Sequence, residues 1–412
     1  MMIKELPIGI STFPELIQKD YVYIDKTNII YTIISKKKYY FLNRPRRFGK
    51  SLLISTIETI FTGNKDLFSG LAISTLPYDW QIYPIISISF AGISSTTPEA
   101  LENGIKRYLQ KIAKKYHCIL KEGTSGEMLQ ELVETLATQN SVVLLIDEYD
   151  YPILQHIHDN HIAAQMRDTL KNFYGVIKDL DKHLRFVFFT GVSKFVNTSL
   201  FSGLNNLQDI GLKPEYNNLL GYTATEISHY FKPHLIQASH FMDCSIEQLL
   251  IDITAWYDGY QFTIENNVTK IYNPFSVLLF LDNKRFSNYW FQTGTPTFLI
   301  NLLKTKEYPI QDFEHIEATE SDLNIFDIDT IPLKTLLFQT GYITITHYNP
   351  KTRNYILTYP NRETTDSFTA LKQIKHKKYY QPYESLNKKI ILIGIAFDTI
   401  LKNISEIEHE DL

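Results

Sequence analysis

The chain has 412 residues, of which 44% are hydrophobic and 21% charged, and its formal net charge is −4. A chain of this length can form two or three domains with a substantial core. The charge argues against a generally basic surface that coats nucleic acid. Its two cysteines form neither a disulfide framework nor a metal-binding spacing. No apolar run approaches the roughly 20 residues that span a bilayer, so we expect a cytoplasmic protein without a membrane partner.

The first part of the chain predicts a short helix followed by alternating strands and helices. Asp25 or Thr27 is a candidate N-cap for an apolar-periodic stretch near residues 29–34. Alternation of strands and helices predicts an α/β fold, a parallel sheet with helices on both faces that binds ligands at the carboxyl ends of its strands. The predicted strands are residues 39–43, 84–90, 142–146 and 185–190, and the predicted helices are residues 50–62, 97–117, 126–138 and 162–179.

Residues 44–51 have the layout of a phosphate-binding loop. They read Arg-Pro-Arg-Arg-Phe-Gly-Lys-Ser, follow an apolar run and precede a helix-forming stretch. In such a Walker A loop the backbone N–H groups surround phosphate oxygens, the lysine (Lys50) reaches the terminal phosphates and the serine hydroxyl (Ser51) binds Mg²⁺. The standard pattern has glycine where this chain has Arg44, so only Gly49, Lys50 and Ser51 match it. The loop therefore needs a second signal.

The second signal is the run of residues 142–148, which has five apolar residues followed by two carboxylates. Such a run suits a strand buried on both faces of a parallel sheet. Asp147 is expected to lie beside the phosphate loop and to hold Mg²⁺ through water, as in a Walker B motif. Glu148 is expected to polarise the attacking water. The alternative is a buried strand that ends in a solvated acidic turn.

Three arginines give the loop an unusual charge. Residues 36–50 include seven basic side chains and no acidic one, and Arg44, Arg46 and Arg47 lie in the loop itself. Arginine makes planar bidentate contacts to phosphate. These side chains are therefore expected to offset the missing glycine, and one of them to stabilise charge during phosphoryl transfer. The alternatives are ion pairs with acidic side chains or a nucleic-acid patch.

Other candidates for contact with the nucleotide are Phe48 and Leu52, on either side of the Gly-Lys-Ser triplet. Two hydroxyl residues, Thr190 and Ser193, follow the fourth strand. One of them is expected to hydrogen-bond the γ-phosphate or the attacking water. The alternative is a strand-end hydroxyl that satisfies backbone groups. Lys194 is a further candidate of the same kind.

The remainder of the chain predicts two more parts after residues 1–212. Residues 213–345 are expected to form a mostly α-helical domain, with a capped helix start at Thr223 and Glu226 and a hairpin around residues 341–345. In residues 346–412 we expect a strand at 355–359, a basic helix at 371–380, an apolar strand at 390–397 and an acidic end.

Motifs in a particular order carry a family resemblance. They are Pro7-Ile-Gly-Ile-Ser-Thr-Phe, Tyr23-Ile-Asp-Lys-Thr27, Arg44-Pro-Arg-Arg-Phe-Gly-Lys-Ser51, Leu145-Ile-Asp-Glu-Tyr-Asp150, Phe189-Thr-Gly-Val-Ser-Lys194, Trp256-Tyr-Asp-Gly-Tyr260, Tyr272-Asn-Pro-Phe275 and Tyr289-Trp290. Over roughly residues 5–345 the chain resembles the bacterial AAA-ATPase-like proteins. The resemblance implies a P-loop NTPase that uses ATP and Mg²⁺. It implies Lys50 and Ser51 as phosphate and Mg²⁺ ligands, and Asp147 and Glu148 as the acidic pair. The loop of that family also begins with arginine.

Members of that family usually continue into a PD-(D/E)xK nuclease domain. Such a domain needs an Asp on one strand and a Glu/Asp-x-Lys on the next, to bind a divalent metal. Residues 359–363, 371–380 and 393–397 resemble its beginning, its late helix and its closing strand. After residue 355 no Asp or Glu is followed two places later by Lys. We expect residues 346–412 to be an inactive remnant with an internal deletion near residues 363–366.

Three functions remain open from the sequence. The first is an ATP-hydrolysing switch or motor that acts on a DNA or protein partner. The second is a non-hydrolysing nucleotide-binding scaffold or a decayed gene copy. The third is direct nucleic-acid binding through the basic residues 36–50 and 372–378, which would depend strongly on salt. The oligomeric state is also open.

Overall fold

The computed structural model describes residues 3–195, 199–201, 204, 206–266, 268–290, 315–324, 332–365, 391–398 and 403–411. At its centre is a five-stranded sheet made of β1 (Tyr39–Asn43), β2 (Ile85–Ser89), β3 (Val142–Asp147), β4 (Leu184–Gly191) and β5 (Gln208–Asp209). The strand order is β2-β3-β4-β1-β5, and every neighbouring pair is parallel. The predicted α/β fold is confirmed, and all four predicted strands are present.

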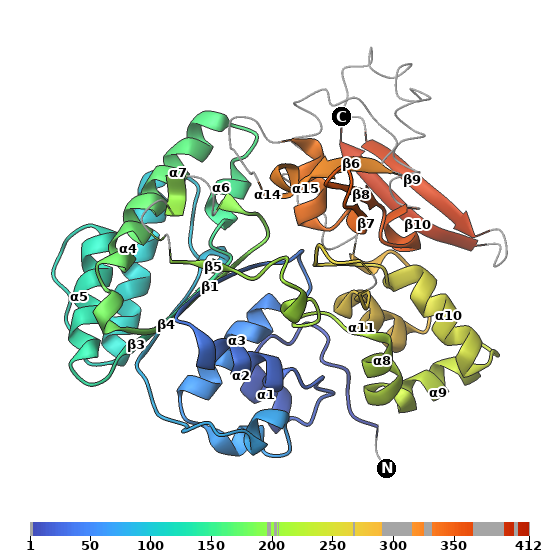
Figure 1. The fold of residues 1–412 in the computed structure, drawn as a ribbon, viewed down its shortest axis with the longest axis horizontal. Helices are drawn as coiled ribbons and strands as arrows, with labels where there is room; N and C mark the ends of the chain where they lie inside the picture. Colours follow the sequence, from blue (N-terminus) through green and yellow to red (C-terminus); the bar gives the residue numbers. More distant parts are fainter. Residues whose placement is uncertain are drawn as a thin grey trace.

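Helices cover both faces of this sheet, as Figure 1 shows. On β3 the side chains alternate between the faces. Val143 and Leu145 pack with the core of one face, whereas Leu144 and Ile146 pack with that of the other. The first face is covered by α1 (Phe13–Gln18), α2 (Thr27–Lys36) and α3 (Lys50–Phe61). The second is covered by α4 (Pro98–Lys115), α5 (Ser125–Ala137), α6 (Tyr151–Gln155) and α7 (Asn160–Gly175).

The predicted helices at residues 50–62, 97–117, 126–138 and 162–179 correspond to α3, α4, α5 and α7. The start of α2 differs in detail from the expected cap. Its N-cap is Lys26, without a side-chain cap, and Thr27 is the first helical residue. Asp25 still satisfies this end of the helix, because its Oδ1 accepts hydrogen bonds from the backbone N–H and the hydroxyl of Thr27, at 2.8 and 2.7 Å.

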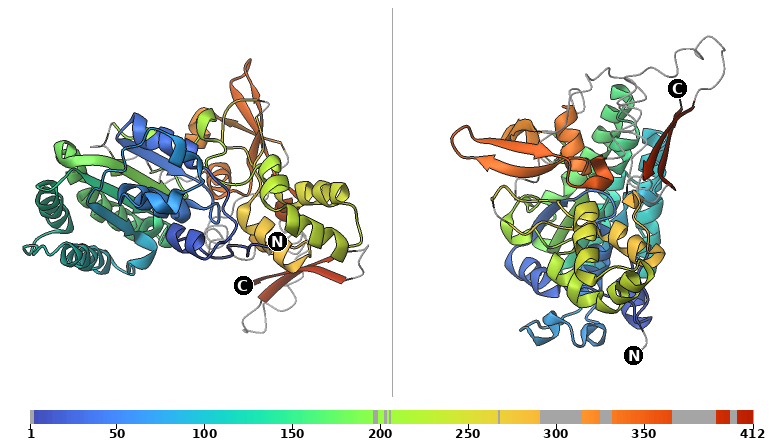
Figure 2. Two further views of the ribbon diagram at one scale, coloured as in Figure 1. Left: turned by 90° about the horizontal axis from the view of Figure 1, so that it is seen from below. Right: turned by 90° about the vertical axis from the view of Figure 1, so that its right-hand side faces the viewer.

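A group of helices beside the sheet forms a second core. It consists of α8 (Ala224–Tyr230), α9 (Lys232–Phe241), α10 (Ile246–Tyr257) and α11 (Pro274–Asn283). The predicted cap is confirmed, since Thr223 and Glu226 form a capping box at the start of α8. Val22 and Ile24 from the N-terminal segment pack into the core of these helices. The views in Figure 2 show the N-terminal segment running alongside this group of helices. The extended N-terminal segment thus joins the two cores.

The remaining described elements include two antiparallel sheets. One has the order β6-β8-β7, from β6 (Ile316–Thr319), β7 (Thr344–Asn349) and β8 (Asn354–Thr358), with α14 (Glu320–Asn324) and α15 (Leu333–Thr340) beside it. The predicted strand at residues 355–359 is confirmed as β8. The predicted hairpin position is wrong, because Gly341 ends α15 and the hairpin turns between β7 and β8.

The other antiparallel sheet is a two-stranded ribbon of β9 (Ile391–Asp398) and β10 (Asn403–Asp411), which lies at the edge of the molecule in both views of Figure 2. The strand expected at residues 390–397 is confirmed as β9, whereas the acidic end forms a strand that the sequence did not predict. The basic helix expected at residues 371–380 lies outside the described residues. Among the helices described, none is long and apolar enough to cross a membrane.

Candidate functional site

The candidate site lies at the carboxyl edge of the parallel sheet. Leu42 on β1 pairs with Thr190 on β4, and Ile146 on β3 pairs with Phe189, so these three strands end at nearly the same level. The phosphate loop connects β1 to α3. Gly49 is the N-cap of α3 with φ +94°, a left-handed conformation that glycine adopts without strain. No side chain of the described residues caps α3, so its N-terminus presents backbone N–H groups, as an anion site requires.

Lys50 is buried beneath this loop. Its Nζ donates hydrogen bonds to the carbonyl oxygens of Arg44 and Pro45, at 3.0 and 2.9 Å. Burial lowers the pKa of Lys50, and the nearby carboxylates of Glu148 and Asp147 oppose that shift. The ammonium group therefore lies among the loop carbonyls and on the side of the acidic strand end, where the sequence predicted a phosphate ligand.

Ser51, Asp147 and Thr190 form a single hydrogen-bonded group. Ser51 Oγ donates to Asp147 Oδ2 at 2.6 Å, and Thr190 Oγ1 donates to Asp147 Oδ1 at 2.5 Å. Thr190 is fully buried, and Asp147 is buried as well. The two predicted Mg²⁺ ligands are thus adjacent. Thr190 and Ser51 donate to different oxygens of the Asp147 carboxylate, so both orient it; the predicted contact of Thr190 with the γ-phosphate or the attacking water stays a prediction.

Glu148 follows the strand and lines the same cavity as Lys50 and Ser51. Its φ of +52° is uncommon for a residue with a side chain. Burial raises the pKa of the Glu148 carboxyl, and the positive charge of Lys50 opposes the shift. A carboxyl group with a raised pKa is a stronger proton acceptor than an ordinary glutamate. Glu148 thus lies in the cavity with Lys50 and Ser51, and its expected role in polarising the attacking water stays a prediction.

Arg44 lies in a different place from the other loop arginines. Its guanidinium donates to the carbonyl oxygens of Asn43, Gly211 and Tyr216, at 2.9, 2.6 and 3.0 Å. It also lies 4.2 Å over the ring of Phe262. The side chain is 1% exposed, and burial lowers its pKa to about 9. Arg44 therefore holds the base of the loop to the segment after β5, and its placement argues against direct contact with phosphate.

Arg46 and Arg47 line the cavity, as expected for phosphate ligands. Arg47 is exposed and its guanidinium lies 4.9 Å from the ring of Phe275. Phe48 points the other way, into a small buried cluster with Tyr260 and Phe262. The loop thus presents two arginines to the cavity and anchors itself through Phe48, which was predicted as a nucleotide contact.

The cavity beside the loop has a volume of about 430 Å³. Besides the predicted loop residues and Glu148, four other segments contribute to its wall. The N-terminal segment contributes Pro7, Gly9, Ile10 and Ser11, the start of α6 contributes Tyr151, the segment before α8 contributes Tyr222, and α11 contributes Pro274, Phe275 and Leu278. The sequence reasoning missed these residues as site residues. The available signal was the presence of Pro7-Ile-Gly-Ile-Ser and Asn-Pro-Phe275 among the family motifs.

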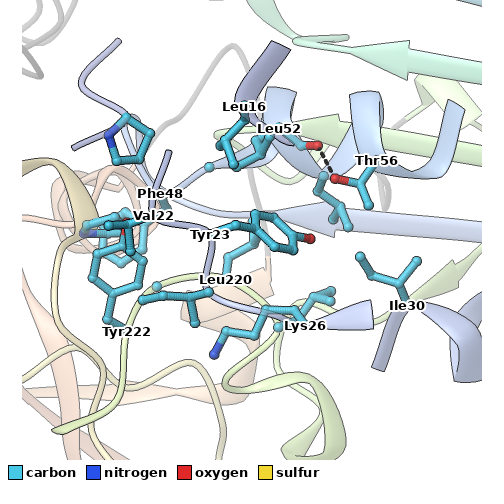
Figure 3. Close-up of a pocket in the computed structure, with 17 residues that line it drawn as sticks. Leu16, Val22, Tyr23, Lys26, Ile30, Phe48, Leu52, Thr56, Leu220 and Tyr222 are labelled. Atoms are coloured by element: carbon cyan, nitrogen blue, oxygen red, sulfur yellow. Dashed lines mark hydrogen bonds between the residues drawn. The ribbon is translucent and has the colours of Figure 1, made fainter. Parts of the chain in front are cut away.

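A smaller cavity of about 90 Å³ adjoins the first one, and both are lined by Pro7, Gly49, Leu52, Tyr222 and Pro274. Figure 3 shows the predicted contact Leu52 at its wall, together with other apolar side chains and the ring of Tyr23. Lys26 is the only cationic residue of its described lining, and its Nζ pairs with Glu226 at 2.5 Å. This ion pair connects the N-terminal segment to α8.

Ser193 and Lys194 are not among the residues that line the cavity. The hydroxyl and backbone N–H of Ser193 donate to Asp150 Oδ2, at 2.6 and 2.7 Å. Lys194 Nζ pairs with Asp209 at 2.8 Å. All three of the residues Asp150, Ser193 and Lys194 are almost fully buried. The Ser193 hydroxyl thus bonds a side-chain carboxylate and not the backbone group that the alternative expected, and its contact with the nucleotide stays a prediction.

The basic run of residues 36–50 does not form one patch. Lys36, Lys37 and Lys38 precede β1, whereas Arg46 and Arg47 follow it, so the strand separates them to opposite edges of the sheet. Lys38 is also paired with Asp181 at 3.1 Å. The second basic run, residues 372–378, lies outside the described residues. The described structure therefore gives no continuous basic surface from the first run.

Comparison with known proteins agrees with this geometry. A family model described as "Predicted AAA-ATPase" matches residues 7–201. An uncharacterized protein from the vnfD 5′ region of Azotobacter chroococcum mcd 1 is 40% identical over 375 residues, which cover 89% of this chain and 69% of that protein. The chain belongs to the predicted AAA-ATPase family. Membership supports a nucleotide-binding, ATPase-like role for the matched region, which contains the loop and the acidic strand end.

The part of this predicted AAA-ATPase that was expected to begin a nuclease domain packs against the helices. Asn361 Nδ2 donates to the Asp258 carbonyl at 2.7 Å, and Glu363 is fully buried. Strand β7 also runs across residue 345, the predicted boundary. The division of the chain at residues 212 and 345 stays a prediction.

Proposed function

We propose that this protein is a Mg²⁺-dependent ATPase whose triphosphate site is formed by Arg46, Arg47, Gly49, Lys50 and Ser51. The observation that carries the proposal is the direct contact of Ser51 with Asp147 beside the buried ammonium of Lys50. A hydroxyl, a carboxylate, a lysine and a helix N-terminus thus meet at the edge of one parallel sheet. This combination of groups suits a phosphate chain and its metal ion.

The donor set fits Mg²⁺. Ser51 and Asp147 supply two hard oxygen ligands, and Mg²⁺ in nucleotide sites takes one or two protein ligands and completes its shell with phosphate oxygens and water. Within the part of the chain that is described, no group of three His, Cys, Asp or Glu side chains could hold a metal ion alone. Bound Mg²⁺ would supply charge neutralisation of the phosphates. Thr190 keeps Asp147 oriented through its 2.5 Å hydrogen bond.

The roles of the other side chains follow from their positions. Lys50 exchanges its bonds to the loop carbonyls for bonds to terminal phosphate oxygens. Glu148 accepts a proton from the attacking water, which its raised pKa favours. Arg46 and Arg47 stabilise negative charge from the open side of the cavity. We propose that the base lies against apolar residues of the cavity wall, which include Ile10 and Leu278; the choice of adenine rests on the family.

The test is the binding of Mg²⁺-ATP to the purified protein and to Lys50→Ala, measured by titration calorimetry. Loss of a charge-assisted contact costs about 1.5–3 kcal/mol, which corresponds to a roughly 10- to 100-fold weaker Kd. Lys36→Ala is the matched control, because Lys36 is exposed at the other end of β1. No binding by the wild-type protein, or equal binding by Lys50→Ala, would refute the proposal.

We further propose that the ATPase cycle acts as a switch on a DNA or protein partner and that the chain has no nuclease activity of its own. The second statement rests on the missing Glu/Asp-x-Lys triplet after residue 355. Turnover of ATP, measured with and without duplex DNA, tests the choice of partner. Stimulation of ATP turnover by duplex DNA would favour a DNA partner, and unchanged turnover would favour a protein partner.

A further inference from the structure

The underside of the phosphate loop is held by a residue far along the chain. The indole Nε1 of Trp290 donates a hydrogen bond to the carbonyl oxygen of Arg46, at 3.0 Å and across 244 positions. Trp290 is fully buried. The contact comes from outside residues 7–201, the part of the chain that the family model matches. The loop conformation is therefore not determined within the loop alone.

The accepting carbonyl belongs to the peptide group that precedes Arg47. Arg47 has a φ of +66°, a left-handed conformation that is strained for a residue with a side chain. A hydrogen bond to the Arg46 oxygen fixes the plane of that peptide group and so opposes its rotation to an unstrained conformation. This plane also sets the direction of the Arg46 and Arg47 side chains, which line the cavity.

Trp290 is itself held by a buried carboxylate. Glu363 Oε1 accepts the backbone N–H of Trp290 at 2.6 Å, and both carboxylate oxygens lie 2.9 Å from the hydroxyl of Ser276 on α11. Glu363 is fully buried. Because α11 also carries Phe275, which lies under the Arg47 guanidinium, one carboxylate connects the support of the loop to the wall of the cavity.

Packing around the indole leaves it little freedom. The ring of Tyr342 lies 5.1 Å from that of Trp290, and the ring of Tyr260, which contacts Phe48 of the loop, lies 6.4 Å away. A Cβ placed on Gly341 would lie 2.7 Å from the Pro45 ring and 3.4 Å from Trp290. The indole is thus enclosed against the loop from several sides.

We propose that Trp290 is a positioning residue for nucleotide binding, which keeps the phosphate loop in its binding conformation through the Arg46 carbonyl, and that Glu363 holds Trp290 in place. The inference rests on the proposed function. It assigns residues 276, 290 and 363 to the ATP site although none of them lines the cavity.

The first test compares Trp290→Phe with Trp256→Phe, by the Kd for Mg²⁺-ATP and the thermal midpoint. Phenylalanine keeps an aromatic ring and removes the N–H donor. Trp256 is a matched control because it is also buried, on α10, and it stacks on Phe286. We expect about a fivefold weaker Kd for Trp290→Phe only, the effect of one lost hydrogen bond. Unchanged binding, or equal loss in both variants, would overturn the inference.

The second test separates positioning from general stability. In an Arg47→Gly variant, the glycine at position 47 adopts a positive φ without strain. Trp290→Phe should therefore weaken the binding of Mg²⁺-ATP less in this variant than in the wild-type protein. If the two substitutions weaken binding additively, Trp290 does not act through the conformation of residue 47.

Glu363→Gln keeps an acceptor for the Trp290 N–H and should bind ATP better than Glu363→Ala. Equal binding by both variants would exclude the role of Glu363. Absence of binding by the wild-type protein would instead refute the proposed function.

Discussion

Ser51 Oγ lies 2.6 Å from Asp147 Oδ2, although the two residues are 96 positions apart. Ser51 is in the first turn of α3, and Asp147 ends β3. The strand that precedes Ser51 is β1, and it is not a neighbour of β3, because β4 lies between them. The contact exists because α3 starts at the carboxyl edge of the sheet and passes over it toward β3.

Removal of the Ser51 hydroxyl should reduce the effect of Mg²⁺ on the binding of ATP. In Ser51→Ala we expect roughly tenfold weaker binding of ATP in the presence of Mg²⁺, because one of two hard oxygen ligands is lost. Binding in the presence of a chelator should change little. Ser51→Thr keeps the hydroxyl and should bind as the wild type does. A Kd for Mg²⁺-ATP that is the same in Ser51→Ala and Ser51→Thr would exclude this role.

Substitution of Glu148 should separate binding from hydrolysis. Glu148→Gln keeps the shape of the side chain and removes the proton acceptor, so we expect turnover to fall by about 10²- to 10⁴-fold while the Kd for ATP stays near the wild-type value. Phosphate release and calorimetry measure the two quantities. If the wild-type protein binds ATP but releases no phosphate, it is a non-hydrolysing module.

The same variant should change how stability depends on pH. Burial raises the pKa of Glu148 above the ordinary value of 4.5. The folded protein then binds this proton more tightly than the unfolded chain does, so the carboxyl contributes stability that is fully present below pH 4.5 and is lost as the pH rises through the raised folded-state pKa. We expect Glu148→Gln to melt at a higher temperature than the wild type at pH 7. This difference should shrink toward pH 4.5; a constant difference would show that the carboxyl does not titrate as described.

Arg44 should matter for stability more than the other loop arginines. Arg44→Met leaves the buried carbonyls of Gly211 and Tyr216 without their donor, and each unsatisfied buried group costs about 1–3 kcal/mol. We expect a loss of about 3 kcal/mol in the free energy of unfolding, measured with urea. Arg47→Met is the control, because Arg47 is exposed and surface substitutions change stability by about 0.5 kcal/mol or less. Similar losses of unfolding free energy in Arg44→Met and Arg47→Met would contradict the structural role of Arg44.

Gly341 should tolerate no side chain. It has a φ of +92°, and a Cβ there would lie 2.7 Å from Pro45 of the phosphate loop. We expect Gly341→Ala to lose about 2 kcal/mol of stability and to bind ATP less tightly, because Pro45 must move. Gly92→Ala is the control, since a Cβ on Gly92 meets no atom within 4 Å. Wild-type affinity in Gly341→Ala would show that the loop does not depend on this contact.

The sequence predicted the central sheet well because its strands have a strong local signal. The first five residues of β3 are apolar and buried, and the two carboxylates Asp147 and Glu148 come directly after them. Local capping chemistry was equally informative at Thr223 and Glu226. The hairpin was misplaced because Gly341 is a left-handed C-cap of α15, and glycine serves helix ends and hairpin turns alike.

The sequence could not predict the direction in which each loop side chain points. Arg44, Arg46 and Arg47 are chemically identical, yet Arg44 is buried against backbone carbonyls and the other two face the cavity. Thr190 was a candidate contact to the γ-phosphate or the attacking water, and only the structure shows that its hydroxyl donates to Asp147. The N-terminal and α11 residues of the cavity carry no ionisable chemistry that would mark them as site residues.

The sequence by itself determined the α/β class and the chemistry-bearing segments, because apolar runs, glycine and adjacent carboxylates act over a few residues. The tertiary structure alone decided the contacts that no motif predicts: packing of distant segments brings Trp290 to the carbonyl of Arg46, and Arg44 to the carbonyl of Gly211. These contacts depend on burial and hydrogen bonding between residues far apart in the chain, for which a single sequence carries no local signal.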